Sequence, residues 1–291
     1  MVRPAGCGQP GRRIVPIRLF ITAGVWAGAV VAAFGRRGYF QSMCGRYAMD
    51  QETDQLINEF VATGGDFRNW RPGWNISPRQ TIPVLIHSAK GAAEAVRRLE
   101  PARWSLTPSW STELKTKFPT FNARAENITE KATWKGPIKT HRALVPASGY
   151  YEWHTDPETK EKTPFYIQAP GGELLVFAGL YSWWKDHSKA DDDPELWTLT
   201  ATIITSVAVD KLLHIHDRNP VPLPRDLWDD WLNPEIIGDQ NFVDAAVHAA
   251  LPIAGALDIH QVGPVRGDGP NLIEAVWELE GTEDWLSTET P

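Results

Sequence analysis

Seven short runs of β-forming residues follow one another through the middle of this chain, with no regular helical pattern between them. Each run is bounded by Pro, Gly, Asp or Ser, which end strands and form turns. The order therefore predicts an α+β fold, with a mostly antiparallel β-barrel-like core and flanking helices, rather than a doubly wound fold. The runs are residues 81–87, 94–104, 121–126, 141–153, 163–169, 174–184 and 197–205.

Helical patterns lie outside these runs. Residues 49–65 carry apolar residues at helical spacing, with Asp50 as the expected N-cap and Gly64-Gly65 as the expected stop. Apolar residues three and four apart predict three further helices. These cover residues 210–216, 224–232 and 241–251, and residues 257–265 are typical of a last strand.

Composition indicates a folded protein with no global attraction to nucleic acid. The chain has 291 residues, of which 42% are hydrophobic, and it carries 14 tryptophans. That is enough for one large domain or two small ones, and it argues against disorder. The formal net charge is −7. Any DNA site must therefore be a local cluster of Arg and Lys.

The cysteine content excludes two kinds of stabilisation. Cys7 and Cys44 are the two cysteines of the chain, which is too few for a disulfide framework or a structural zinc site. A reducing compartment is the simplest interpretation. His214 and His216 form a His-x-His pair, but no third ligand lies near them in sequence. We therefore predict no metal and no cofactor.

The first 43 residues differ from the rest of the chain. Arg12 and Arg13 precede an apolar stretch that Arg18 interrupts. This stretch could be upstream DNA translated from an early start codon, a signal peptide or membrane anchor, or the remnant of a tag. We predict a leader over residues 1–43, one domain over residues 44–280, and a tail over residues 281–291.

Four segments carry groups that could do chemistry, and each also has an ordinary explanation. Cys44 could be a small buried hydrophobe. Glu152 could be a surface carboxylate on a strand, although Tyr151 and Trp153 beside it could exclude water. His216 could cap a helix C-terminus. Asn122 and its neighbour Arg124 could serve as a strand-end hydrogen bond and a solvated charge.

Together the segments resemble a family. "MCGRY", "NISP", "NARAE", "GYYEW", "FAGLY", "IHDRNP" and "VRGDGPNLIE" are similar, in the same order, to motifs of the SOS-response-associated peptidase (SRAP) family. The resemblance runs from Cys44 to about Glu274. It implies a compact α+β domain around a β-barrel-like core with a positively charged cleft. Members of this family shield abasic sites in single-stranded DNA by bonding to them covalently.

The resemblance also implies a nucleophile. In the family it is the cysteine left at the N-terminus when the initiator methionine is removed, which matches Cys44 if translation begins at Met43. An α-amine attacks the ring-opened aldehyde of the abasic sugar to give an imine, and the thiol of the same residue closes a thiazolidine ring. An internal cysteine cannot do this, because its nitrogen is locked in an amide.

The family's remaining roles carry over to matched positions. Glu152 resembles the catalytic glutamate, which moves protons at the amine and at the departing water. His216 resembles the histidine that helps to open the sugar, and Asn122 the asparagine that orients cysteine and lesion. The resemblance also implies a set of DNA-binding residues. These are Arg46 and Arg124 for phosphates, Asn75 in the cleft, and Trp110 for base stacking.

Two departures and two alternatives remain. Relatives can carry two adjacent aromatics where this chain has Trp110 and Ser111, and a larger residue than Asn219. The same residues could instead form a cysteine peptidase, with Cys44 as nucleophile, His216 as base and Asn122 as orienter. A non-catalytic DNA-binding module is the other alternative. On the first hypothesis we expect a cytoplasmic, nucleoid-associated monomer whose partner is single-stranded DNA with abasic sites and whose mature form has no membrane segment.

Overall fold

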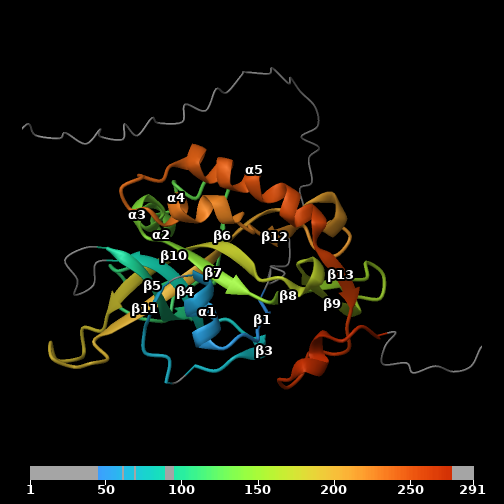
Figure 1. The fold of residues 1–291 in the computed structure, drawn as a ribbon, viewed down its shortest axis with the longest axis horizontal. Helices are drawn as coiled ribbons and strands as arrows, with labels where there is room; N and C mark the ends of the chain where they lie inside the picture. The colour runs from blue at the N-terminus through green and yellow to red at the C-terminus, as the bar shows by residue number, and fades with distance from the viewer. Residues whose placement is uncertain (1–44, 61, 69, 89–94, 277–291) are drawn as a thin grey trace, which may run out of the picture. The chain divides into compact units, whose positions relative to one another are not determined.

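A closed barrel forms the centre of the protein, as the computed structural model shows for residues 45–60, 62–68, 70–88 and 95–276 (Figure 1). Five strands, each hydrogen-bonded to the next, form the ring of this barrel. They are β5 (Val96–Trp104), β4 (Thr81–Ser88), β7 (Arg142–Ala147), β10 (Leu175–Lys185) and β11 (Trp197–Val207). Four of the five contacts are antiparallel, and a parallel contact between β11 and β5 closes the ring. This confirms the predicted α+β fold with a barrel-like core.

Three short strands extend the barrel sheet. β12 (Arg218–Pro220) pairs antiparallel with β11, β6 (Asn122–Arg124) pairs parallel with β11, and β2 (Thr63–Gly64) pairs parallel with β5. Thus β11 pairs with strands from two separate sequence motifs, β6 from "NARAE" and β12 from "HDRNP". This strand becomes the scaffold of the candidate site.

A second sheet is antiparallel throughout. Its order is β13, β9, β8, β1 and β3. Their bounds are β13 (Asp258–Gln261), β9 (Lys162–Gln168), β8 (Gly149–Thr155), β1 (Tyr47–Met49) and β3 (Gly73–Ile76). The predicted strand over residues 141–153 is therefore two strands, β7 and β8, which belong to different sheets. Ser148 lies at the corner between them.

That corner corrects the predicted helix cap. Asp50 does not begin a helix, because its carboxylate accepts a hydrogen bond from Ser148 Oγ, which in turn accepts the Asp50 N–H at 3.1 Å. The helix α1 starts later and covers Thr53–Phe60. Residues 210–216 also differ from expectation, since they contain a 3₁₀ turn over Asp210–Leu212 in place of an α-helix.

The other helices pack around the barrel. They are α2 (Ala132–Lys135), α3 (Pro137–Thr140), α4 (Trp228–Leu232) and α5 (Gln240–Ala256). The predicted helix at residues 241–251 is confirmed within α5, whose N-cap Asp239 accepts the Phe242 N–H at 2.8 Å. Trp231 of α4 donates to Ala143 O of β7 at 3.0 Å and stacks on Phe242. These contacts bind α4 and α5 to the barrel.

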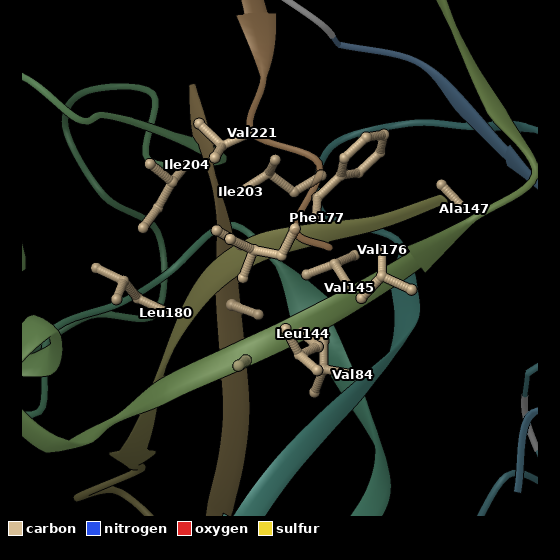
Figure 2. Packing of buried hydrophobic residues seen from close by; sticks show 14 of the residues in the cluster. Val84, Leu144, Val145, Ala147, Val176, Phe177, Leu180, Ile203, Ile204 and Val221 are labelled. Carbon is tan, nitrogen blue, oxygen red and sulfur yellow. The ribbon is translucent and has the colours of Figure 1, made fainter. Parts of the chain in front are cut away.

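The barrel interior is apolar. Side chains from β4, β7, β10 and β11 gather inside it, joined by Val221, which follows β12 (Figure 2). Val84, Leu144, Phe177 and Ile203 are each fully buried there. At about 25 cal/mol per Å² of buried apolar surface, such a core supplies the main stabilising term of the fold. The polar side chains singled out in the sequence lie outside this interior, on β6, on β8 of the second sheet and just before β12.

Candidate functional site

The N-terminal side of β1 lies alongside β8, the strand that carries Glu152. Tyr47 pairs with Tyr150, and Tyr151 donates its N–H to Arg46 O at 3.0 Å, which extends the pairing by one residue. The same antiparallel register, continued once more, matches Gly45 with Glu152. Glu152 is 3% exposed. A buried carboxylate therefore lies at the strand position where the chain from Cys44 enters the sheet.

The "HIHDRNP" segment reaches the same part of the second sheet. Glu152 pairs across the sheet with Phe165 of β9. The Phe165 ring meets the His214 ring edge-on, with centroids 6.4 Å apart, and His154 Nδ1 lies 2.5 Å from His214 O. Two contacts thus hold the segment that contains His216, one from the cross-strand partner of Glu152 and one from His154, two residues after Glu152 on β8.

His216 is buried, and its Nδ1 has two competing neighbours. Arg218 N–H donates to Nδ1 at 3.1 Å, and Asp217 Oδ1 lies 3.1 Å from the same atom. The first contact needs an unprotonated Nδ1, whereas the second needs a proton on it. Burial lowers the pKa of His216, and the Asp217 carboxylate opposes that fall. The neutral ring is therefore favoured near neutrality, with Nε2 as the proton-bearing nitrogen when Nδ1 accepts from Arg218.

An ion pair joins two of the predicted motifs. Arg218 donates from Nη1 and Nη2 to the two carboxylate oxygens of Glu126, each at 2.8 Å, and from Nη2 to Thr205 O at 2.6 Å. Partial burial alone would raise the pKa of Glu126, but the hydrogen bonds and charge of Arg218 bring it below its ordinary value. The fork geometry fixes β12 against the chain that follows β6.

Asn122 begins β6 on the opposite side of β11 from β12. It pairs in register with Ile203, and Arg124 pairs with Thr205. On the other edge of the same strand, Thr205 pairs with Pro220. The "NARAE" and "HDRNP" motifs therefore meet across β11. This contact is not evident from the sequence, because about ninety residues lie between the two motifs.

The structure gives Asn219 a role that the sequence did not reveal. It is buried, its Oδ1 accepts the Val209 N–H at 3.2 Å, and its Nδ2 donates to Pro220 O at 2.6 Å. Ala208 N–H also donates to Asp217 O at 3.0 Å. These bonds close the base of the loop that bears His214 and His216. The small amide side chain at residue 219 is the sequence feature that could have indicated this role.

Arg46 and Asn75 form one network with the "VRGDGPNLIE" motif. Arg46 Nη1 donates to Asn75 Oδ1 at 2.6 Å, and Asn75 Nδ2 donates to Gly267 O at 2.6 Å. Asp268 accepts the Trp74 N–H at 2.7 Å. Gly267 has φ +76, a conformation that favours glycine. This network joins two predicted DNA-binding residues and fixes β1 and β3 to the C-terminal segment.

The remaining predicted DNA-binding residues face solvent. Arg124 is exposed, and Trp110 is 68% exposed. Sequence reasoning missed Phe118, which is 78% exposed on the same connection between β5 and β6 as Trp110. Lys115 and Lys117 stand close to it in sequence. An aromatic residue directly after two closely spaced lysines in a polar loop is the pattern that could have identified it.

Cys44 and the leader over residues 1–43 lie outside the described residues, as does the tail over residues 281–291. The apolar stretch of the leader is therefore not described either. Of the helices that the structure describes, none is long and apolar enough to cross a membrane. Within residues 45–276 with their gaps, no group of three His, Cys, Asp or Glu side chains could hold a metal ion.

These contacts define a barrel-based α+β protein whose buried glutamate, buried histidine and strand-edge asparagine come from distant motifs. A family model described as SOS response associated peptidase (SRAP) matches residues 43–265. The chain belongs to this family.

Relatives and solved structures support this assignment. The chain is 34% identical to the abasic site processing protein YoqW of Bacillus subtilis, over 80% of this chain and 100% of that protein. It is 33% identical to the abasic site processing protein HMCES of Xenopus tropicalis, over 63% of this chain and 64% of that protein. A crystal structure from Bacteroides thetaiotaomicron shares the fold, with a TM-score of 0.64 and 20% identity, and covers 80% of this chain and 99% of its own. A phage-related protein from Bordetella bronchiseptica gives a TM-score of 0.54 at 27% identity, over 76% and 95%.

Proposed function

We propose that this protein processes abasic sites in single-stranded DNA by forming a covalent adduct through Cys44. The names of the relatives support abasic sites as the substrate. The observation that carries the proposal is the pairing of Arg46 with Tyr151, because it brings the chain from Cys44 into the sheet beside the buried Glu152. The proposal requires the amine and thiol of an N-terminal Cys44 to approach this carboxylate.

The chemistry proceeds in balanced steps. The α-amine of Cys44 adds to the aldehyde carbon of the ring-opened sugar, and the carbinolamine loses water to give an imine. The thiol then adds to the imine carbon, and the nitrogen takes up a proton as the thiazolidine ring closes. Free α-amines titrate near 7.7–8.0 and thiols near 8.5, so both have a reactive fraction at neutral pH. The tethered second nucleophile gains from proximity.

Glu152 and His216 divide the proton transfers. Glu152 accepts a proton from the attacking amine and returns it to the departing hydroxyl. His216, neutral and buried, donates a hydrogen bond from Nε2 to the sugar oxygen as the ring opens. Asn122 orients the lesion from the edge of β11. The Glu126–Arg218 ion pair and Asn219 keep the histidine loop in position.

DNA binding would then be independent of sequence. An abasic residue has no base to read, so contacts fall on phosphates and on neighbouring bases. Arg124 and Arg46 supply charge, and the exposed Trp110 and Phe118 supply stacking surfaces. Because the net charge of the chain is −7, the affinity depends on these local groups and falls with salt.

Protein that begins at Cys44 tests the proposal. It is incubated with single-stranded DNA that contains one abasic site, and the products are separated on a denaturing gel. We expect a heat-stable adduct that Cys44→Ala abolishes and Glu152→Gln slows by about 10² to 10⁴-fold. Protein that retains residues 1–43 serves as the matched control, since its Cys44 nitrogen is an amide.

Three results would contradict the proposal. An adduct that persists in Cys44→Ala refutes the assigned nucleophile. Absence of an adduct, together with peptide cleavage that depends on Cys44 and His216, would instead support the cysteine peptidase alternative. Salt-sensitive DNA binding with neither activity would indicate a non-catalytic module.

A further inference from the structure

The residue before Asn122 lines a hollow of about 220 Å³, which also includes Phe118. Seven residues line it, and none is acidic. They are Pro78, Arg79, Ser105, Thr116, Phe118, Pro119 and Phe121. Phe121 directly precedes Asn122 and holds the wall in place, because its carbonyl accepts hydrogen bonds from Trp104 Nε1 at 2.9 Å and from Ile203 N at 3.0 Å. The hollow is thus continuous with the strand edge that carries Asn122.

Two arginines give this region positive charge: Arg79, which lines the hollow, and Arg103, which lies outside its lining but close enough for the two charges to repel each other. Arg103 immediately precedes Trp104 on β5, and it pairs with Thr81 on one neighbouring strand and with Thr200 on the other. Its Nη1 is buried and has no hydrogen-bond partner among the residues that the structure describes. Burial lowers the pKa of Arg103, and the positive charge of Arg79 lowers it further. Two guanidinium groups that repel each other are stabilised by an anion between them.

The backbone presents Arg79 at this position. Arg79 is exposed and has φ +77, which is uncommon for a residue with a side chain. Its N–H donates to Trp104 O at 2.7 Å, so the turn is bonded to the end of β5. This fixes the base of the Arg79 side chain next to Arg103.

The other walls suit the remainder of a nucleotide. Ser105 Oγ and Thr120 Oγ1 lie 2.9 Å apart, and Thr116 Oγ1 lies 3.2 Å from Thr120 Oγ1. The exposed Phe118 ring also lines the hollow, and it is apolar where these hydroxyls are polar. A phosphate needs cationic and hydroxyl donors, and a sugar or base needs an apolar face.

We propose that this hollow is a phosphate-binding subsite for a nucleotide that flanks the lesion, with Arg79 and Arg103 binding its phosphodiester group. The proposal rests on the proposed function, because it takes single-stranded DNA as the ligand. It extends the DNA path from Asn122 past Phe121 to the turn that follows "NISP". The shared chemistry is a phosphate group, which a free nucleotide could also supply.

Equilibrium binding of undamaged single-stranded DNA to the full chain tests the subsite. Fluorescence anisotropy compares short oligonucleotides with oligonucleotides extended on the 5′ side or on the 3′ side, at several salt concentrations. Arg79→Asn removes the guanidinium while asparagine tolerates φ +77, so this variant retains the turn. Arg103→Gln is the second variant, and Arg225→Ala is the matched control because Arg225 is already paired with Glu59.

We expect Arg79→Asn to weaken binding of the extended oligonucleotide roughly fivefold and to reduce the slope of log K against log[salt] by about 0.7, the value for one single-strand phosphate contact. Short oligonucleotides should bind both proteins equally. Equal binding of the extended oligonucleotide by the variant and the unchanged protein, or equal losses in Arg225→Ala, would overturn the subsite. The subsite would also be overturned if a free mononucleotide abolished the extra affinity that the extension gives, because that result would identify a small-molecule site.

The adduct assay separates this proposal from the proposed function. If the adduct forms and Arg79→Asn has no effect on binding, the subsite fails alone. If no adduct forms but binding depends on Arg79, the chemistry fails and the subsite stands. If the full chain binds no single-stranded DNA, both fail.

Discussion

Arg218 and Glu126 bind each other through two parallel hydrogen bonds of 2.8 Å, although 91 residues lie between them in the sequence. Arg218 is 8% exposed, whereas the Glu126 side chain is about half exposed. The pair connects the residues after β6 to β12 across the edge of β11. Through it, the strand that carries Asn122 is linked to the loop that carries His216.

Removal of Glu126 should therefore destabilise the fold. Glu126→Ala leaves a buried guanidinium without its counter-charge, and we expect the free energy of unfolding to fall by about 2–3 kcal/mol, below the range for a fully buried pair because water reaches Glu126. Urea denaturation measures this. Asp66→Ala is the control, since the Asp66–Arg68 pair is exposed and should contribute nothing measurable. Equal midpoints for the two variants would show that the Glu126 pair does not stabilise the fold.

The pKa of His216 should make stability depend on pH. Burial puts this pKa below its ordinary value of about 6.5. Above pH 6.5 the ring is neutral in both the folded and unfolded chains, so it contributes no pH dependence. As the pH falls below 6.5, the unfolded chain binds a proton that the folded chain resists, and stability decreases until the folded pKa is reached.

Asp217→Asn should extend that range toward acid. The Asp217 carboxylate opposes the lowering of the pKa of His216, so its removal lowers this pKa further. An NMR titration of the His216 ring protons, together with urea denaturation at pH 7.5 and 5.5, measures both effects. Asp230→Asn removes an exposed charge elsewhere and should leave the titration unchanged. An unchanged pKa in Asp217→Asn would mean that the Asp217 carboxylate does not act on the His216 ring, and an upward shift would contradict the prediction.

A glycine at the start of β8 controls the position of Glu152. A Cβ on Gly149 would lie 2.4 Å from Tyr166 Cζ and 2.7 Å from Ile167 O, so Gly149→Ala must displace either β9 or the strand itself. We expect a loss of about 1–3 kcal/mol of stability and slower adduct formation. Gly255→Ala is the matched control, because nothing lies within 4 Å of its Cβ and alanine favours a helix. A Gly149→Ala protein as stable as the Gly255 variant would contradict this packing.

The sequence predicted the barrel because strand-forming runs without intervening helices leave few other arrangements. It did not reveal the corner at Ser148, because Pro146 and Gly149 on either side of it lie within β7 and β8, which leaves Ser148 alone between the two strands. It also missed the Arg218–Glu126 pair and the role of Asn219. Those contacts depend on β6 and β12 lying on opposite edges of β11, which is a matter of topology and not of local pattern.

The site residues also divide into those that the sequence motifs predicted and those that only the fold reveals. Glu152 and His216 were predicted from their motifs; both are buried, and the contacts of His214 hold the His216 segment against β8 and β9. Arg46 and Asn75 were predicted as separate DNA contacts, yet their side chains bond to each other. Phe118 was missed because an isolated aromatic in a loop has no periodic pattern, and its exposure becomes evident from the folded chain.

Trp110 and Phe118 should contribute to DNA binding by stacking. Each exposes most of its ring on the connection between β5 and β6, and base stacking on an aromatic residue contributes about 1–3 kcal/mol per base. Trp110→Ala and Phe118→Ala should each weaken binding of undamaged single-stranded DNA at least fivefold, with unchanged salt slope because no charge is removed. Trp197→Ala removes another half-exposed tryptophan and is the control. If Trp197→Ala weakens binding as much as Trp110→Ala, the loss reflects general surface hydrophobicity. If neither loop variant weakens it, the DNA does not follow this loop.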